Sequence, residues 1–374
     1  MAKMLRCRLV LLVIFLFFCG AVNCIGAEVS SQHLVSPKLL EQADLKILWE
    51  NKLPIKAGES LERLFIPFDR AQGRLGNRIY VLSDRNYMIS LHREKGHVIF
   101  SKPFVAAGLP VVGLELYRGE LFSVVGNELV EINPEFGAKL SSKRLRFGAV
   151  CPAARNSSYY YLSGVDRRMH ALRAGDKVQV FEVSAENDSV ITSIVADENF
   201  VVFATDAGNV ISISADRPKR LWSFDASDSI AGQIVRDSSS LFFASKDTNV
   251  YRINVRTGRF VWKCQTAAML ERGPRVGKKV VYQYVRDKGL AAIDKESGKL
   301  IWQWSEGVDL LAESGRKAYV ITNTGKLVVM DNKKAKQLYS VNFVGVSRYA
   351  TNVTDSKIYI ADEGGRIACL EPVE

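Results

Sequence analysis

A repeat of about 40 residues runs through most of the chain and constrains its fold more than any other feature. Eight short apolar runs follow turns, and successive ends of these runs are 41, 40, 41, 40, 40, 37 and 40 residues apart. The runs end at Leu91, Ile132, Leu172, Ile213, Ile253, Ile293, Met330 and Leu370. Strand-like segments with this period are typical of β-propeller blades, so the count predicts eight blades.

A second strand-like segment precedes each run by eight to eleven residues. These segments are rich in aromatic and β-branched residues, which favour a pleated, half-buried surface. They cover residues 79–82, 121–124, 159–162, 201–204, 241–244, 280–282, 318–321 and 358–361. Asp, Asn and Gly stand between the two strands, as in residues 206–209 and 323–325. Such residues tolerate positive φ, so each pair is predicted to form a hairpin.

A third strand follows a turn that ends in glycine, and it carries an aromatic residue four positions after that glycine. The clearest copies are Ile253-Asn254-x-x-Thr257-Gly258-x-x-x-Trp262 and Ile293-Asp294-x-x-Ser297-Gly298-x-x-x-Trp302. They resemble the A-x-D-x-x-T-G-x-x-x-W motif of PQQ-like, or quinoprotein-type, propeller repeats. The resemblance implies that the aromatic residue packs between neighbouring blades.

The match to this motif weakens in the other blades. Gly96 and Phe100 keep both positions in the first blade, and Ser141 stands at the aromatic position of the second. Phe181, Trp222 and Tyr339 keep only the aromatic residue. As a pattern, the resemblance still covers nearly the whole chain after the first 27 residues, although only two repeats match the motif closely.

The two ends of the repeat region are each incomplete. Residues 45–51, which contain Trp49, read as an outermost blade strand with too few residues before it for the rest of a blade. The last blade ends at Leu370, before any outermost strand. Pairing the two would close the ring and remove two exposed sheet edges. We therefore expect an all-β, eight-bladed propeller of four-stranded antiparallel blades over residues 45–374, with a closing strand at 45–54 and blades over 60–374.

The first 27 residues have the features of a secretory signal peptide. Lys3, Arg6 and Arg8 precede an unbroken apolar run over residues 9–18, and small residues follow near Ala27. The apolar stretch is shorter than the roughly 20 residues of a membrane-spanning helix, although an uncleaved anchor is the alternative. Cys24 leaves open a lipid-modified start in place of cleavage near Ala27. With the signal peptide ending at Ala27, we expect residues 28–44 to be a linker to the propeller.

The chain carries a formal charge of +11, and loss of the three basic signal residues would leave +8. Export makes nucleic acid an unsuitable partner and leaves acidic proteins, anionic lipid head groups and anionic glycans. Basic clusters occur at residues 143–146, 167–168, 219–220 and 333–336, all at predicted turns or strand starts. Solvated loops are the simpler interpretation of these clusters.

Residues suited to catalysis or metal binding are few. Cys151, Cys264 and Cys369 remain after the signal and are predicted to be buried free thiols. The four histidines have no metal-ligand spacing, and the sequence contains no nucleophile elbow or phosphate loop. We expect no metal site and no cofactor.

A quinone-dependent dehydrogenase is the alternative function, because enzymes of the PQQ-like family oxidise alcohols or sugars. Those enzymes are much longer and carry calcium ligands and a catalytic aspartate in insertions between blades. Here the one notable insertion, at residues 69–76, contains a single carboxylate. We interpret Asn254, Asp294 and Asp331 as turn residues rather than ligands.

The favoured function is a non-catalytic scaffold that binds proteins in the periplasm or at the outer membrane, as a monomer within a complex. In blade number, closing strand and lack of large insertions, the chain resembles the propeller lipoproteins of the outer-membrane β-barrel assembly machinery. Exposed loops held by rigid strands suit such binding. The candidates are the basic loop with Lys143, Arg144 and Arg146, and the first-blade insertion at residues 70–78.

Overall fold

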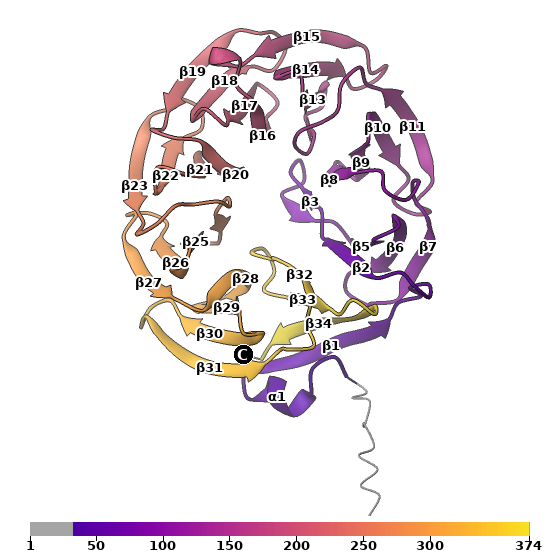
Figure 1. Cartoon of the computed structure of the whole chain (residues 1–374), viewed down its shortest axis with the longest axis vertical. Coiled ribbons are helices and arrows are strands. Elements are labelled where there is room, and N and C mark those ends of the chain that lie inside the picture. The colour runs from indigo at the N-terminus through magenta and orange to yellow at the C-terminus, as the bar shows by residue number, and fades with distance from the viewer. Residues whose placement is uncertain (1–32, 374) are drawn as a thin grey trace, which may run out of the picture. The chain divides into compact units, whose positions relative to one another are not determined.

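A computed structural model describes residues 33–373, and the predicted signal peptide and Cys24 lie outside these residues. The described chain forms a closed ring of eight sheets around a central axis, and the four blade strands of each sheet are antiparallel (Figure 1). This arrangement confirms the predicted fold class. In the described part, no helix is long and apolar enough to span a membrane.

Each blade has four strands, which we number from the channel outward. The first strands are β2 (Leu61–Phe65), β8 (Val111–Tyr117), β12 (Ala154–Arg155), β16 (Ile191–Ala196), β20 (Ile230–Asp237), β24 (Arg275–Val276), β28 (Gly307–Ser314) and β32 (Arg348–Ala350). The second strands are β5 (Arg78–Ser83), β9 (Glu120–Val125), β13 (Tyr159–Ser163), β17 (Phe200–Thr205), β21 (Ser240–Ser245), β25 (Val280–Val285), β29 (Lys317–Thr322) and β33 (Ile358–Ala361).

The two outer strands of each blade contain the repeat seen in the sequence. The third strands are β6 (Tyr87–His92), β10 (Glu128–Ile132), β14 (Arg168–Arg173), β18 (Asn209–Ser214), β22 (Asn249–Asn254), β26 (Gly289–Asp294), β30 (Lys326–Asp331) and β34 (Arg366–Pro372). The outermost strands are β7 (Val98–Pro103), β11 (Lys139–Arg144), β15 (Gln179–Ser184), β19 (Arg220–Asp225), β23 (Phe260–Gln265), β27 (Leu300–Trp304), β31 (Lys336–Asn342) and β1 (Leu45–Lys52). A short 3-10 helix, η1 (Glu186–Asp188), connects blades 3 and 4.

The ring closes in blade 8, where the N-terminal strand β1 pairs with the C-terminal strand β34. The pairing is antiparallel from Leu45 opposite Pro372 to Lys52 opposite Arg366, and Trp49 lies opposite Cys369. This confirms closure by the N-terminal strand. Because β1 and β34 come from opposite ends of the repeat region, the blade holds the ring shut through their shared hydrogen bonds.

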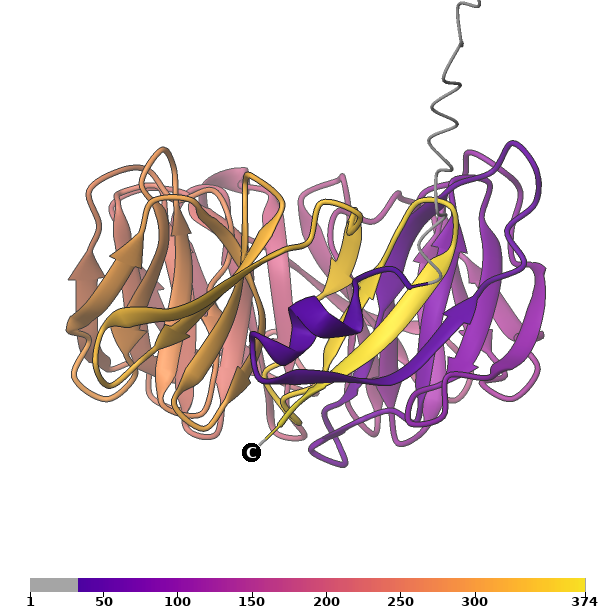
Figure 2. The same ribbon diagram turned by 90° about the horizontal axis from the view of Figure 1, so that it is seen from below.

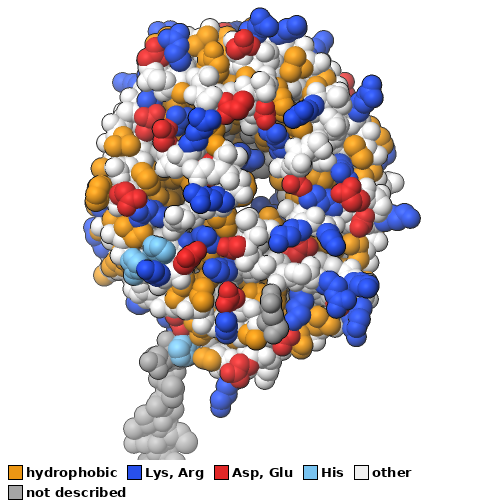
Figure 3. All heavy atoms as spheres, turned by 180° about the vertical axis from the view of Figure 1, so that it is seen from behind, with side chains coloured by type: hydrophobic (Ala, Val, Ile, Leu, Met, Phe, Trp, Pro, Cys, Tyr) orange, Lys and Arg blue, Asp and Glu red, His pale blue; other side chains and the backbone are white. Residues whose placement is uncertain are grey.

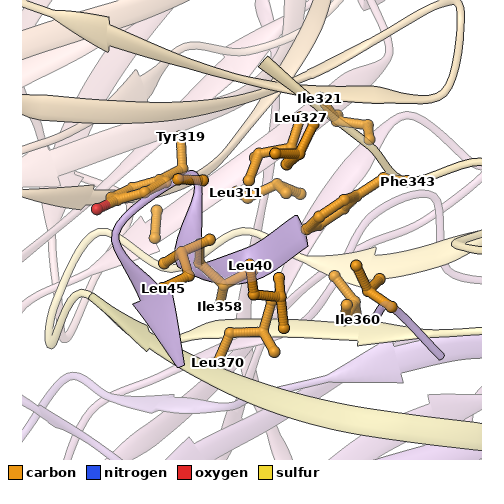
Figure 4. Packing of buried hydrophobic residues seen from close by; sticks show 14 of the residues in the cluster. Leu40, Leu45, Leu311, Tyr319, Ile321, Leu327, Phe343, Ile358, Ile360 and Leu370 are labelled. Atoms are coloured by element: carbon orange, nitrogen blue, oxygen red, sulfur yellow. The ribbon is translucent and has the colours of Figure 1, made fainter. Parts of the chain in front are cut away.

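The segment before β1, predicted to be a linker, packs on the ring in its described part. Helix α1 (Pro37–Glu41) lies against the outer side of blades 7 and 8 (Figure 2). Leu40 is fully buried in a cluster that includes Leu45, Tyr319 and Phe343 (Figure 4). Apolar burial of this kind contributes roughly 1.5–3 kcal/mol for a Leu side chain.

All eight outermost strands share a β-bulge immediately before the aromatic position of the motif. In blade 5, for example, Arg252 pairs with Trp262 and Ile253 with Phe260, which leaves Val261 unpaired. The bulged residues are all apolar: Leu48, Ile99, Leu140, Val180, Leu221, Val261, Ile301 and Leu338. A bulge increases the twist of an edge strand and hinders pairing with another chain, so the exposed blade edges are protected in the same way throughout.

Candidate interaction face at the channel mouth

The ring has two faces that are built from different connections. Neighbouring strands are antiparallel, so the connections from first to second strands and from third to outermost strands lie on one face, here called the mouth face. The second-to-third hairpins and the connections between blades lie on the opposite face, here called the hairpin face. Figure 3 looks onto the mouth face and shows a hollow at the centre of the ring.

The first-blade insertion forms a small hairpin that crosses to the neighbouring blade. Strands β3 (Phe68–Asp69) and β4 (Arg74–Leu75) pair with each other, and Asp69 pairs in parallel with Leu116 of β8. The insertion thus extends the sheet of blade 2 to six strands and lies near the channel (Figure 1). It forms one wall of the mouth.

The single carboxylate of the insertion, Asp69, holds this hairpin in place. Its Oδ1 accepts hydrogen bonds from the backbone N–H groups of Ala71, Gln72 and Arg118 at 3.0–3.1 Å, and its Oδ2 accepts one from Gly119 at 2.8 Å. The residue is 2% exposed. Because four backbone donors saturate the buried carboxylate, Asp69 positions the hairpin and is not presented to a ligand.

The hairpin covers one side of a cavity of about 590 Å³ at the channel mouth. The rest of the cavity wall comes from the first-to-second connections of blades 2, 3, 4 and 5. A volume in this range suits a small molecule or a few side chains of a partner protein. The cavity therefore brings together residues from five separate parts of the repeat.

A hydrogen-bonded network centred on Glu198 joins blades 2, 3 and 4 at this cavity. The Tyr117 hydroxyl donates to Glu198 at 2.5 Å, and the Ser157 backbone N–H and hydroxyl donate to the same carboxylate. Burial raises the pKa of Tyr117 to about 12, helped by its bond to the Glu198 carboxylate. Burial also opposes ionisation of Glu198, but the bonds from Ser157 and Tyr117 keep its pKa below the usual range. The network thus holds an ionised carboxylate between three blades.

The arginines of the mouth differ in how far they are neutralised. Arg155 is almost buried, lies over the Tyr160 ring at 4.6 Å and forms an ion pair with Glu120. Arg236 forms an ion pair with Asp197. Arg70, on the hairpin, is exposed and has no carboxylate within ion-pair distance in the described chain. The free positive charge of the mouth therefore lies on the insertion.

A carboxylate lies deeper in the channel, below Arg70. Glu115 of β8 lines a narrow space with Arg70, Arg155 and Gln233. Burial raises the pKa of Glu115, and the charge of Arg70 opposes that rise. The channel therefore changes from exposed positive charge at its mouth to a carboxylate that burial biases toward the neutral form.

The other predicted binding loop lies on the hairpin face. The prediction of a loop is wrong for Lys143 and Arg144, because both belong to β11, where they pair with Leu129 and Glu128. Arg146 lies in the connection that follows and is exposed. The structure does not bring these three residues together with the insertion, and their role in partner binding stays a prediction.

The aromatic residues of the repeat motif lie between blades. The indole rings of Trp222 and Trp262 cover Gly258 and Gly298 of the next blade, where an added Cβ would lie 2.7 Å from ring atoms. Their Nε1 atoms donate to the carbonyls of Val255 at 3.2 Å and Lys295 at 3.0 Å. In the same way, Phe100 covers Gly137. Phe181, Trp302 and Tyr339 are half-buried or buried at the equivalent positions of their blades.

The residues that we interpreted as turn formers accept hydrogen bonds from backbone N–H groups of their own turns. Asn254 Oδ1 accepts from the backbone of Arg256 and Thr257, and Asp294 Oδ1 accepts from that of Ser297. Asp331 Oδ1 accepts from Lys333 and Lys334 in the same way. Over residues 33–373, no three His, Cys, Asp or Glu side chains are grouped closely enough to hold a metal ion.

The mouth residues Tyr117, Arg155, Glu198 and Arg236 were not singled out from the sequence. They follow or end the first strands, which have no clear repeat pattern, and they meet only because the ring brings their turns together. The one signal that the sequence offers is a tyrosine or charged residue at, or within two residues of, the end of the first strand in blades 2–5.

Comparison with known proteins identifies the family. A family model described as outer membrane protein assembly factor BamB matches residues 125–268, 208–340 and 286–373. Together these matches cover well over half of the chain. The chain belongs to this PQQ-like propeller family. Curated proteins gave no match.

Solved structures show the same fold as this member of the PQQ-like family. BamB from Moraxella catarrhalis has a TM-score of 0.67 and 12% sequence identity, with 87% of this chain and 97% of that chain covered. A computationally designed protein, Ika8, has a TM-score of 0.66 and 12% identity, with 85% and 98% covered. At this identity the likeness establishes the fold and leaves the function open.

Proposed function

We propose that this chain is a non-catalytic scaffold that binds other proteins during the assembly of outer-membrane proteins. Membership of the family described as outer membrane protein assembly factor BamB supports this proposal most directly. The proposal includes export by residues 1–27 and a location in the periplasm or at the outer membrane.

The construction of the mouth face supports a docking role. Blades 2–5 and the insertion present short turns on a rigid ring, and the mouth cavity is open to solvent. Turns fixed in this way lose little conformational entropy on association. At the rim of the cavity, exposed Arg70 has no carboxylate partner in the described chain, and exposed Arg118 has only Glu198, at 3.8 Å. A partner segment that carries a carboxylate therefore fits the rim best.

Cross-linking in cells followed by purification of this chain tests the proposal. Wild-type protein should capture proteins of the outer-membrane assembly machinery. The double variant Arg70→Glu, Arg118→Glu should lose most of that capture, because it reverses the charge at the mouth. The matched control Lys246→Glu, Lys288→Glu changes two exposed lysines on the hairpin face and should capture as wild type does.

Two results would contradict the proposal. Wild-type protein that captures no envelope-assembly protein would remove the scaffold role, and equal capture by the mouth variant and wild type would remove the mouth as the docking site. The variant Arg144→Glu, Arg146→Glu tests the predicted loop separately. If it alone loses capture, the partner binds at the hairpin face.

A further inference from the structure

The turns between third and outermost strands differ sharply in charge around the ring. In blades 4–7 they cover residues 215–220, 255–260, 295–300 and 332–336 and carry nine exposed Lys and Arg against two exposed acidic residues. The equivalent turns of blades 1–3, residues 93–98, 133–139 and 174–179, carry two exposed Lys and three exposed acidic residues. We call the first set the basic arc.

Most of the charge on the basic arc is not neutralised within the molecule. Arg217 and Arg220 have carboxylate partners, Asp216 and Glu186. The other seven basic side chains have no carboxylate within ion-pair distance in residues 33–373. Of the two acidic residues in the arc, Glu296 is already bound by Arg252 from the neighbouring blade at 2.8 Å. The arc therefore presents a continuous excess of positive charge across four successive blades.

Exposed apolar side chains lie at the same rim, at the start of the outermost strands. Phe260 and Leu300 are each 54% exposed, and Leu221 is 48% exposed. Apolar residues recur at the rim of blades 1–3 as well, for example Phe136 and Leu140. Only in blades 4–7 do they stand within an excess of positive charge. Figure 3 shows Lys and Arg side chains along the right-hand rim, where these blades lie.

We propose that the basic arc docks the propeller on an anionic phospholipid surface. Lysines and arginines are attracted to anionic head groups, and apolar side chains between them can enter the interface. The arc residues do not line the mouth cavity, so the surface that they form is broad and not a pocket for one small anion. Exposed Phe260 and Leu300 favour a lipid surface over a soluble anionic polymer, which would gain little from them.

The arc and the mouth cavity lie on the same face of the ring but in different parts of it, so an edge-on orientation at the membrane leaves the protein-docking surface accessible. The arc follows the outer rim of blades 4–7, whereas the insertion lies at the channel beside blades 1 and 2. A propeller held by the arc stands with one side of its ring at the membrane and its mouth cavity open to partners. The proposal does not depend on the identity of those partners.

Vesicle flotation with the full chain tests the proposal. Wild-type protein should float with vesicles that contain phosphatidylglycerol and not with phosphatidylcholine vesicles, and added salt should release it. The variant Arg256→Glu, Arg259→Glu, Lys299→Glu should bind the anionic vesicles at least ~100-fold more weakly, since each of the three basic residues near such a surface contributes roughly fivefold.

A matched control separates the arc from the overall charge of the protein. The variant Lys246→Glu, Lys288→Glu, Lys326→Glu makes the same change in net charge at exposed positions on the hairpin face of blades 5, 6 and 7. It should bind as wild type does. If wild type shows no preference for anionic vesicles, or if the control loses as much binding as the arc variant, the proposal is wrong.

A second pair of measurements distinguishes a membrane from an anionic polymer. The variant Phe260→Ser, Leu300→Ser should weaken vesicle binding several-fold and leave binding to heparin unchanged. Unchanged vesicle binding together with tight heparin binding would assign the arc to a polymer and overturn the proposal. If the triple arc variant melts at a lower temperature than wild type, Lys333→Glu, Lys334→Glu, Lys336→Glu provides an independent test of the same arc.

Discussion

The indole ring of Trp49 lies directly against the Cα of Gly96, and this contact joins the two ends of the ring. Trp49 belongs to β1 in blade 8, whereas Gly96 follows β6 in blade 1. The Trp49 Nε1 donates to the Arg93 carbonyl at 3.0 Å, and Arg93 forms an ion pair with Asp355 of blade 8. Blade 8 is thus fixed to blade 1 by packing, a buried hydrogen bond and a charge pair.

The substitution Gly96→Ala should destabilise the ring by more than the left-handed backbone conformation at position 96 alone would explain. Gly96 has φ +71°, and an added Cβ would lie 2.4 Å from Trp49 ring atoms. The left-handed conformation costs an Ala ~1–2 kcal/mol, and the steric conflict with the indole should add ~1–3 kcal/mol. Thermal unfolding followed by Trp fluorescence measures the loss.

Gly108→Ala is the matched control for Gly96→Ala. Gly108 has φ +81°, and an added Cβ would meet no atom within 4 Å. It should therefore show only the conformational cost. Equal decreases in melting temperature for the two variants would mean that the contact with Trp49 contributes nothing to closure.

Glu131 should make the junction of blades 2 and 3 sensitive to acid. Blade 2 has Ser141 in place of the aromatic residue, and there Glu131 accepts from Ser141 at 2.6 Å, Tyr160 at 2.7 Å and Lys177 at 3.0 Å. Burial opposes its ionisation, but these three donors hold the pKa of Glu131 below 4.5. Its stabilising effect is complete above pH 4.5 and is lost as the pH falls through the lowered pKa.

The variant Glu131→Gln should therefore melt well below wild type at pH 7, with a loss of ~2–3 kcal/mol because buried Lys177 is left without its partner. The gap between the two melting temperatures should narrow below pH 4.5. Glu128→Gln is the control on the same strand, since the exposed pair of Glu128 and Lys139 is screened by solvent and contributes little. A gap for Glu131→Gln that stays constant from pH 7 to pH 3 would contradict this assignment.

The strands that the sequence predicts well are those buried on both faces. The third strand of blade 5, with Val250 and Ile253 fully buried, has an apolar pattern that repeats in every blade. Trp49 could be assigned to an outermost strand that is far in sequence from the rest of its blade, because the last blade has no outermost strand of its own after β34. Both signals are local in the sequence. The repeated apolar runs were sufficient to predict the number of blades, and the segment with Trp49 was sufficient to predict the closure.

The first strands could not be predicted, because they face the channel and are irregular. β12 and β24 have two residues each, and β20 is interrupted between Ala231 and Val235. A short strand with a bulge and polar channel-facing residues shows no alternation of apolar and polar positions. Apart from the insertion, the residues of the mouth were not predicted for the same reason, since they end or follow these strands.

Contacts between distant segments also escaped prediction. Nothing local in the insertion indicates that Asp69 pairs with Leu116 of the next blade, and nothing around Leu40 indicates a helix docked on blades 7 and 8. Such contacts depend on the closed ring, which brings together residues that are far apart in the sequence.

The three thiols of the described chain should be unreactive in the folded protein. Cys151, Cys264 and Cys369 are buried and unpaired, as predicted. Burial raises the pKa of Cys151 and of Cys369 to about 12, so little thiolate is present at pH 8. A thiol reagent should label none of the three before unfolding and all of them afterwards. Ser227→Cys, at an exposed position, should be labelled at once, and rapid labelling of Cys151 would show that its surroundings open in solution.

Removal of the Asp69 carboxylate should release the hairpin of the insertion and leave the ring intact. In Asp69→Ala, the backbone N–H groups of Ala71, Gln72, Arg118 and Gly119 lose their shared acceptor. Tryptic cleavage after Arg70 and Arg74 should then be at least ~10-fold faster, since a local loss of a few kcal/mol makes opening much more frequent. Asp331→Ala, which removes a carboxylate that bonds only its own turn in blade 7, should leave cleavage at these sites unchanged. If both variants resist trypsin as wild type does, the pairing of β3 with β8 holds the hairpin without Asp69.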